Sequence, residues 1–69
     1  MNLTLEVEQE ADGRWLAEVP QLAGVMAYGQ SPTAAMAKAQ ALALRVLAER
    51  LEYHESLPVN ISISVPSVA

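Results

Sequence analysis

The sequence of 69 residues contains no cysteine and a single histidine. Disulfide bonds are therefore excluded, and one histidine offers no cluster that would hold a structural metal ion. A chain this short buries only about 60% of the surface that its unfolded state exposes, so a folded monomer is marginally stable. We expect one domain over residues 1–69 that binds no cofactor and is stabilised by association into a homodimer or a higher oligomer.

Long apolar runs are also missing. No apolar segment approaches the roughly 20 residues that a membrane-spanning helix needs. The first ten residues are acidic and alternate in polarity, unlike the basic and then apolar start of a secretion signal. The absence of cysteine fits a reducing compartment. These features predict a soluble, cytoplasmic protein with no membrane partner.

Positive charge is scarce, with four lysine and arginine residues against eight acidic ones and a net charge of −4. Four dispersed cations cannot neutralise a row of phosphates, so we expect no direct binding of nucleic acid. A basic protein is a better match for an acidic chain of this size, although the same charge also serves solubility. Charge of either sign is absent from residues 19–37, which indicates either buried core or a surface that another chain covers.

Alternating polarity predicts two strands, over residues 2–10 and 14–19, joined by a turn. A two-residue turn would place a charged residue opposite Val7 on the buried face. A three-residue loop over residues 11–13 instead places Val7 opposite Ala17, with the loop glycine in the left-handed conformation. We therefore predict the three-residue loop.

The same register brings three carboxylates onto the solvent face. Glu6 lies opposite Glu18, and Glu8 lies opposite Leu16. Like charges that face each other across a sheet are mildly destabilising. Either solvent screens this repulsion, or the three glutamates form an acidic patch that awaits a cationic partner.

One long helix of about 22 residues is predicted after a short third strand over residues 25–29. Ser31 is a good N-cap, Pro32 suits the first helical position, and the composition is rich in alanine. Helical spacing directs one set of residues toward the sheet, namely Ala35, Ala39, Leu42, Ala43, Val46 and Tyr53. A second apolar stripe flanks that set and indicates a partner, because one small sheet does not cover both: Leu44, Leu47 and Leu51.

The chain alternates again over residues 59–65, between Pro58 and Pro66. This pattern predicts a last strand whose core face is formed by Val59, Ile61, Ile63 and Val65.

The resulting order of elements is β-β-β-α-β, of the α+β class. Because a helical connection normally returns the chain to a parallel neighbour, the last strand should lie beside the first. We predict a single mixed four-stranded sheet of order 3-2-1-4 with one long helix on one face. Its edge strands, residues 25–29 and 59–65, carry no charge and are open to pairing with another chain. The residues expected at a self-association surface are Val25, Met26, Ala27, Tyr28, Leu44, Leu47 and Leu51.

The segment GRWLAEVPQLAGVMAYGQSPTAAMAKA, residues 13–39, has a distinctive order. A glycine, an aromatic residue and an alanine precede a strand-ending proline, and Leu-x-Gly, a short strand, a glycine, a serine cap and an alanine-containing helix follow. This order resembles the HicB-like antitoxin family, and the match extends from Gly13 to about Leu51.

The resemblance implies a truncated ribonuclease H-like fold and a small basic partner, a HicA-type toxin that cleaves messenger RNA and whose active site the antitoxin covers. The candidate toxin contacts are Glu6, Glu8 and Glu18. Many members of the family carry a C-terminal DNA-binding segment, which we do not expect here because the sequence ends directly after the last strand. The alternative is a homo-oligomeric orphan domain with a structural or scaffold role and no toxin partner.

An enzyme is not expected. Ribonuclease H chemistry needs several carboxylates that converge on two divalent metal ions. Residues 59–65 contain no carboxylate, and the three glutamates are divided between two strands without aspartate companions. His54 has no serine or cysteine nucleophile in a recognisable motif, so we assign no catalytic and no metal-binding residues.

Overall fold

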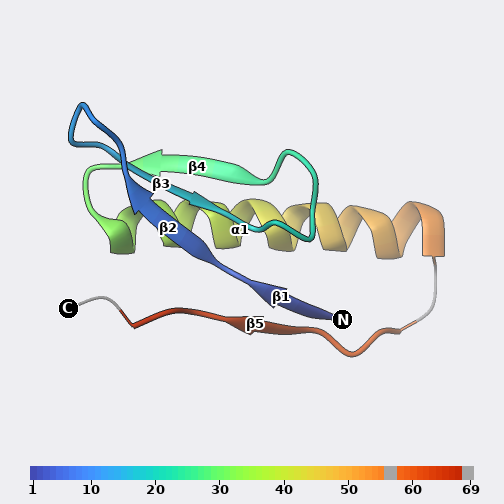
Figure 1. Cartoon of the computed structure of the whole chain (residues 1–69). Coiled ribbons are helices and arrows are strands. Elements are labelled where there is room, and N and C mark those ends of the chain that lie inside the picture. Colours follow the sequence, from blue (N-terminus) through green and yellow to red (C-terminus); the bar gives the residue numbers. More distant parts are fainter. Residues whose placement is uncertain (56–57, 68–69) are drawn as a thin grey trace.

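The computed structural model describes residues 1–55 and 58–67, in which one helix lies against strands of two sheets. The antiparallel sheet contains β2 (Glu6–Gln9), β3 (Trp15–Glu18) and β4 (Met26–Gly29), and β1 (Asn2–Thr4) pairs in parallel with β5 (Ser62–Ser64) (Figure 1). The helix α1 (Pro32–Arg50) continues into a π-helical turn, η1 (Leu51–Glu55). The α+β class, the single long helix and the parallel pairing of the first and last strands are confirmed.

The hairpin between β2 and β3 has the predicted three-residue loop. Its register places Val7 opposite Ala17. The Glu10 N–H donates to the Arg14 carbonyl at 2.7 Å and closes the loop. Gly13 has a φ of 92°, in the left-handed region that glycine adopts without a steric penalty. The pattern of buried and exposed faces was therefore sufficient to select the loop length.

The prediction of a single four-stranded sheet is wrong, because the first strand changes partners at Leu5. Residues before Leu5 pair with β5, and residues after it pair with β3. The ladder of β3 ends at Glu18, since Pro20 has no N–H to continue it and begins a turn. Beyond Glu18, the side chain of Gln21 bonds to Thr4 where a continuation of β3 would otherwise do so. Its Oε1 accepts the Thr4 N–H at 3.1 Å, and its Nε2 donates to the Thr4 Oγ1 at 3.0 Å.

A second proline sets the C-terminal end of β5, which covers only Ser62–Ser64 of the strand predicted over residues 59–65. The Ser62 N–H donates to the Met1 carbonyl at 2.9 Å, and the Leu5 N–H donates to the Ser64 carbonyl at 3.0 Å. The bonds to the first strand therefore use even-numbered residues of this segment. The next donor would be residue 66, but Pro66 has no N–H. The parallel ladder ends at Ser64 for this reason, and β5 does not pair with β2.

The helix α1 begins where the sequence predicts it. Ser31 is the N-cap, and its Oγ accepts the Ala34 N–H at 3.1 Å. The helix packs on β2, β3 and β4. Gly29, at the end of β4, permits a close approach of the helix, because a Cβ atom there would lie 2.5 Å from the Ala35 backbone nitrogen. Among the residues that the structure describes, no helix is long and apolar enough to cross a membrane.

The core lies between α1 and the inner faces of the strands. Its buried apolar residues are Leu3, Leu5, Ala17, Val19, Leu22, Val25, Ala35, Met36, Ala39, Ala43 and Leu47. Two helix predictions are corrected: Leu47 is buried rather than part of an exposed stripe, and Tyr53 is 72% exposed rather than directed at the sheet. The buried face of α1 is rotated toward Met36 and Leu47, and Tyr53 belongs to η1, where a π-helical turn alters the side-chain phase.

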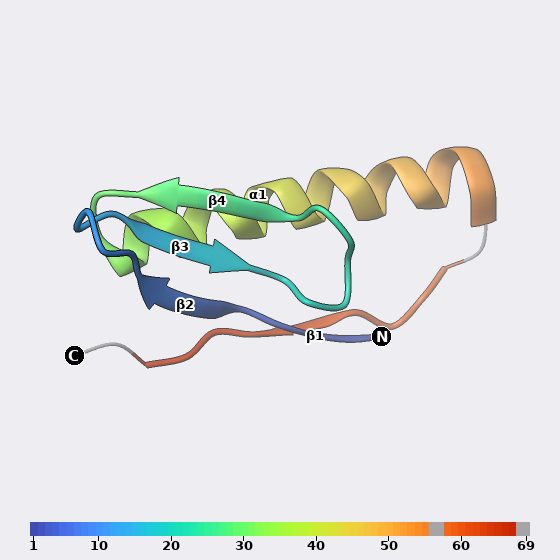
Figure 2. The ribbon, with the colours of Figure 1, turned by 45° about the horizontal axis from the view of Figure 1, so that its top comes forward.

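Three of the four predicted core residues of the last strand are also exposed. Ile63 lies opposite Leu3 and packs against the core, whereas Val59, Ile61 and Val65 are 36%, 38% and 54% exposed. A helix about 10 Å wide covers only two or three strands spaced about 4.8 Å apart. Because α1 covers β2, β3 and β4, β5 extends clear of the helix on the side of the first strand away from β4 (Figures 1 and 2).

Candidate functional site

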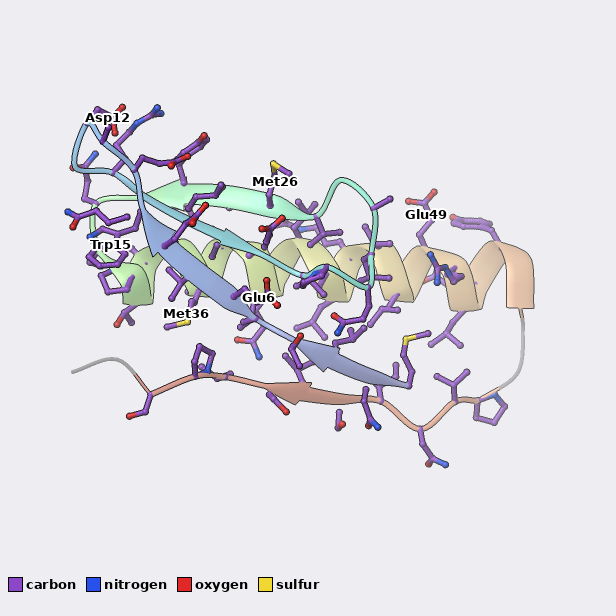
Figure 3. All side chains as sticks on the ribbon, in the orientation of Figure 1. Glu6, Asp12, Trp15, Met26, Met36 and Glu49 are labelled. Carbon is purple, nitrogen blue, oxygen red and sulfur yellow. The ribbon has the colours of Figure 1, made fainter. Side chains whose placement is uncertain are left out.

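Two rows of side chains cross the outer face of the three-stranded sheet, which is the face directed away from α1. The first row is Glu6, Glu18 and Met26, and the second is Glu8, Leu16 and Tyr28. Between the rows, Ala17 is buried and Ala27 packs against the core, so the side chains of the two rows point the other way. Figure 3 shows Glu6 on β2 and Met26 on β4, the two outer strands of this sheet. The face is acidic along β2 and apolar along β4.

Three carboxylates crowd the acidic half of the face. Glu6 lies directly opposite Glu18 in the ladder, and Glu8 is the diagonal neighbour of Glu18. Together with Val7 and Leu16 they line an open hollow of about 150 Å³. Like charges that lie directly opposite one another across a sheet repel, and at an exposed face solvent screens that repulsion.

No cation forms an ion pair with these carboxylates within the part of the chain that the structure describes. Arg14 is the closest in sequence, but its Nε donates to the Asp12 Oδ2 at 2.7 Å and its guanidinium lies 4.2 Å from the centre of the Tyr28 ring. The other three cations belong to α1, behind the sheet. The backbone N–H of Arg14, followed by its guanidinium, holds the pKa of Asp12 below the ordinary value of 3.8. Arg14 is therefore engaged by the loop and by Tyr28.

The apolar half of the face adjoins the acidic half directly. Met26 is 47% exposed and Tyr28 is 41% exposed, and Leu16 lies half-buried between Tyr28 and Glu8. The Tyr28 hydroxyl donates to the Glu10 Oε1 at 3.3 Å. Exposed apolar side chains beside carboxylates without ion-pair partners make a surface suited to a partner that is both basic and apolar.

The structure brings the predicted toxin contacts together, since Glu6, Glu8 and Glu18 share one hollow. It divides the predicted self-association residues among different surroundings. Met26 and Tyr28 lie on the outer face beside the glutamates, and Leu44 is 50% exposed on α1. The remaining members are buried or half-buried: Val25, Ala27, Leu47 and Leu51. The burial of Val25 and Leu47 removes both side chains from any surface that a second copy could contact in this structure.

Sequence reasoning missed that Val59, Ile61 and Val65 are exposed. The alternation of residues 59–65 correctly gives them a common face, but it does not reveal whether the helix covers that face. Two signals in the sequence indicate that it does not. The sequence pattern predicts one helix for all the strands, and Pro66 prevents the last strand from extending along the sheet.

Neither a metal-binding cluster nor a similar protein of known function helps to assign a role to this site. Within residues 1–55 and 58–67, no group of three or more histidine, cysteine or acidic residues is arranged to hold a metal ion. No family model, curated protein or solved structure matches the chain. The candidate site therefore rests on its own geometry and charge.

Proposed function

We propose that this chain is a non-catalytic binding module of the HicB-like antitoxin type, and that the outer face of its three-stranded sheet covers a small basic ribonuclease of the HicA type. The observation that carries the proposal is the direct opposition of Glu6 and Glu18, with Glu8 beside them and no ion-pair partner among the described residues. A partner that inserts lysine or arginine side chains here removes a repulsion and adds an attraction. The repulsion between these carboxylates lowers the free energy of unfolding of the free module, and binding of the cationic partner removes that penalty.

The apolar half of the face supports a protein partner over a small cation. Methionine and aromatic residues are enriched at protein interfaces, and Met26 and Tyr28 supply them beside the glutamates. A small cation would use the carboxylates alone, whereas a folded protein buries both halves of the face. Because the proposed partner acts on messenger RNA, a cytoplasmic location belongs to the same proposal.

The order of elements also supports the antitoxin type. The resemblance runs from Gly13 to about Leu51 and so includes β3, the turn after it, β4 and α1. Three antiparallel strands, a helix and a parallel last strand agree with the element order of a truncated ribonuclease H-like fold, and we propose that likeness for this chain.

The experiment is co-expression with a small basic protein encoded by the gene adjacent to the gene of this chain. We expect the wild-type chain to rescue growth and to co-purify with that protein. The Glu6→Lys/Glu18→Lys variant should lose both effects, whereas Glu49→Lys/Glu52→Lys, with the same change in net charge, should keep them. Glu49 lies on the C-terminal half of α1, well away from Glu6 (Figure 3). Failure of the wild-type chain to rescue or co-purify contradicts the proposal for that neighbour.

The second candidate function is a homo-oligomeric scaffold without a toxin, and the exposed apolar residues of the last strand favour it. Val59, Ile61 and Val65 lie on one uncharged segment beyond the helix. A scaffold should form a stable oligomer alone and protect cells from no toxin. An antitoxin that also self-associates would oligomerise and protect, so the growth assay separates the two functions.

A further inference from the structure

The free edge of the last strand carries an uninterrupted row of backbone hydrogen-bonding groups. The backbone bonds that flank the β1–β5 ladder use even-numbered residues of this segment. The Asn60 carbonyl accepts from the Met1 amino group at 2.6 Å, the Ser62 N–H donates to the Met1 carbonyl at 2.9 Å, and the Ser64 carbonyl accepts the Leu5 N–H at 3.0 Å. Successive residues of a strand direct their N–H and C=O groups to opposite edges. The odd-numbered residues therefore present these groups outward, and the structure gives them no hydrogen-bond partner among the described residues: Val59, Ile61, Ile63 and Val65.

The two prolines that flank this segment leave its free edge open. Pro58 and Pro66 are both even-numbered, so each lacks an N–H on the side of the first strand and not on the free side. Edge strands are usually protected from pairing by lysine, proline or a bulge. Residues 58–67 contain no charged side chain, and no proline interrupts the free edge between residues 59 and 65.

The sequence of the segment is self-complementary. Val59-Asn-Ile-Ser-Ile-Ser-Val65 reads almost identically in both directions. An antiparallel pair with a two-fold axis at Ser62 places Val59 opposite Val65 of the second copy and Ile61 opposite Ile63 of the second copy. Each facing pair joins two residues that direct their backbone groups to the free edge, so both hydrogen bonds of the pair can form. Pairs of β-branched residues then cover one face, and small polar residues occupy the other.

We infer that two copies of this chain dimerise by antiparallel pairing of residues 59–65 about a two-fold axis at Ser62. The pairing brings Val59, Ile61 and Val65, which one copy leaves exposed, into cross-strand contact with apolar residues of the second copy. Two chains of net charge −4 meet here on an uncharged segment, which avoids the repulsion that their acidic surfaces would impose. The dimer uses neither the acidic face nor the basic partner, so it stands independently of the proposed function.

The edge of β4 is the weaker alternative for self-association. The Val19 N–H donates to the Val25 carbonyl at 3.0 Å, so the odd-numbered residues of this segment face β3. Only Met26 and Tyr28 are then left to present backbone groups at its free edge, and the Tyr28 side chain is held by Arg14 and Glu10. The last strand offers four such residues in place of two.

The test uses single cysteines, because the chain has none of its own. In the proposed dimer the two Ser62 residues face each other as a non-hydrogen-bonded pair with Cα atoms about 4.5 Å apart, within the range of a disulfide. Ser62→Cys should form a covalent dimer under mild oxidation. Ser64→Cys is the matched control, since the two Ser64 Cα atoms would lie four residues apart along the strands, about 13 Å. Equal cross-linking of the two variants, or none in either, overturns the pairing.

Solution mass gives a second readout that needs no cross-link. The wild-type chain should sediment at twice its 7.4 kDa mass. Ile61→Lys should raise the dimer dissociation constant at least about tenfold, and Met26→Lys, at an exposed position of β4, should leave it unchanged. Circular dichroism confirms that each variant remains folded, and the cysteine pair decides the matter if Ile61→Lys unfolds. A monomeric wild-type chain, or a dimer lost in Met26→Lys and kept in Ile61→Lys, overturns the inference.

Discussion

Glu6 and Glu18 face each other directly across the β2–β3 ladder, on the side of the sheet that α1 does not cover. Glu8 adjoins them, and Arg14, the cation closest in sequence, pairs with Asp12 and lies over Tyr28 instead. A sheet designed for stability alone would place opposite charges, or none, at this pair. The arrangement is physically reasonable if another molecule supplies the missing cations.

The first prediction is that Glu18→Gln has opposite effects on the stability of the free chain and on its binding to the partner. Glu18→Gln should raise the free energy of unfolding of the isolated chain by a few tenths to about 1 kcal/mol, because it removes the facing like charge. The same substitution should weaken binding of the basic partner. Denaturant unfolding and titration calorimetry measure the two effects. Glu49→Gln on α1, matched in charge change, should alter the unfolding free energy by less than about 0.5 kcal/mol.

This interpretation would be contradicted if Glu18→Gln raised, or lowered, both the free energy of unfolding and the affinity for the partner. If Glu18→Gln destabilises the free chain, Glu18 contributes to the fold and its carboxylate is not a liability. If Glu18→Gln stabilises the chain and leaves binding unchanged, the repulsion is real but the face is not the interface.

The second prediction concerns the contact between the end of β4 and the start of α1. A Cβ atom at Gly29 would lie 2.5 Å from the Ala35 nitrogen and 2.9 Å from its Cα, and neither backbone atom can move aside cheaply. Gly29→Ala should therefore lower the unfolding free energy by about 1–3 kcal/mol, as overpacking does. Thermal and denaturant melts measure it. A loss below about 0.5 kcal/mol would mean that α1 shifts easily and that this contact does not position the helix.

The third prediction concerns pH and the β2–β3 loop. Hydrogen bonds from the Arg14 backbone and guanidinium lower the pKa of Asp12 below 3.8 in the folded state. A carboxyl group with a depressed folded pKa stabilises the fold above its unfolded pKa, and that stability is lost as the pH falls through the folded pKa. The stability difference between wild type and Asp12→Asn should therefore be constant near neutral pH and shrink as the pH falls below about 4. A difference that grows on acidification would have the wrong sign.

The fourth prediction concerns the limit of β5. Pro66→Ala restores an N–H at the position where the parallel ladder stops, opposite the Leu5 carbonyl in the observed register. Hydrogen exchange of the residue 66 amide should then be slower than that of the neighbouring Ser67 amide, which points to the other edge. Equally fast exchange of both amides would show that something other than Pro66 ends the strand.

The local elements could be predicted from the sequence because each rests on nearby residues. The loop followed from the alternation of Val7 and Ala17, and the helix start followed from Ser31. The placement of the three glutamates on one face followed from the same alternation, since register and side-chain face are linked along a strand. The candidate site was therefore largely predictable once the hairpin register was known.

The division of the strands into two sheets could not be predicted in the same way. It depends on two contacts between segments far apart in the sequence. The Gln21 side chain bonds to Thr4 in place of a neighbouring strand, and Pro66 occupies a position whose N–H would have pointed at the first strand. The rotation of α1 that buries Leu47 and the position of β5 beyond the helix are matters of packing between distant segments. Periodicity reports which residues share a face, but not what covers it.

The measurement that tests the central claim most directly is the affinity of the basic neighbour-encoded protein for two variants of equal net charge. Glu6→Gln/Glu18→Gln changes the outer face, and Glu49→Gln/Glu52→Gln changes exposed residues at the far end of the helical segment. We predict that the first pair weakens binding at least about tenfold and the second by less than about twofold. An equal loss of affinity in both double variants would mean that only the net charge of the chain matters. An unchanged affinity in the first double variant would mean that the interface lies elsewhere.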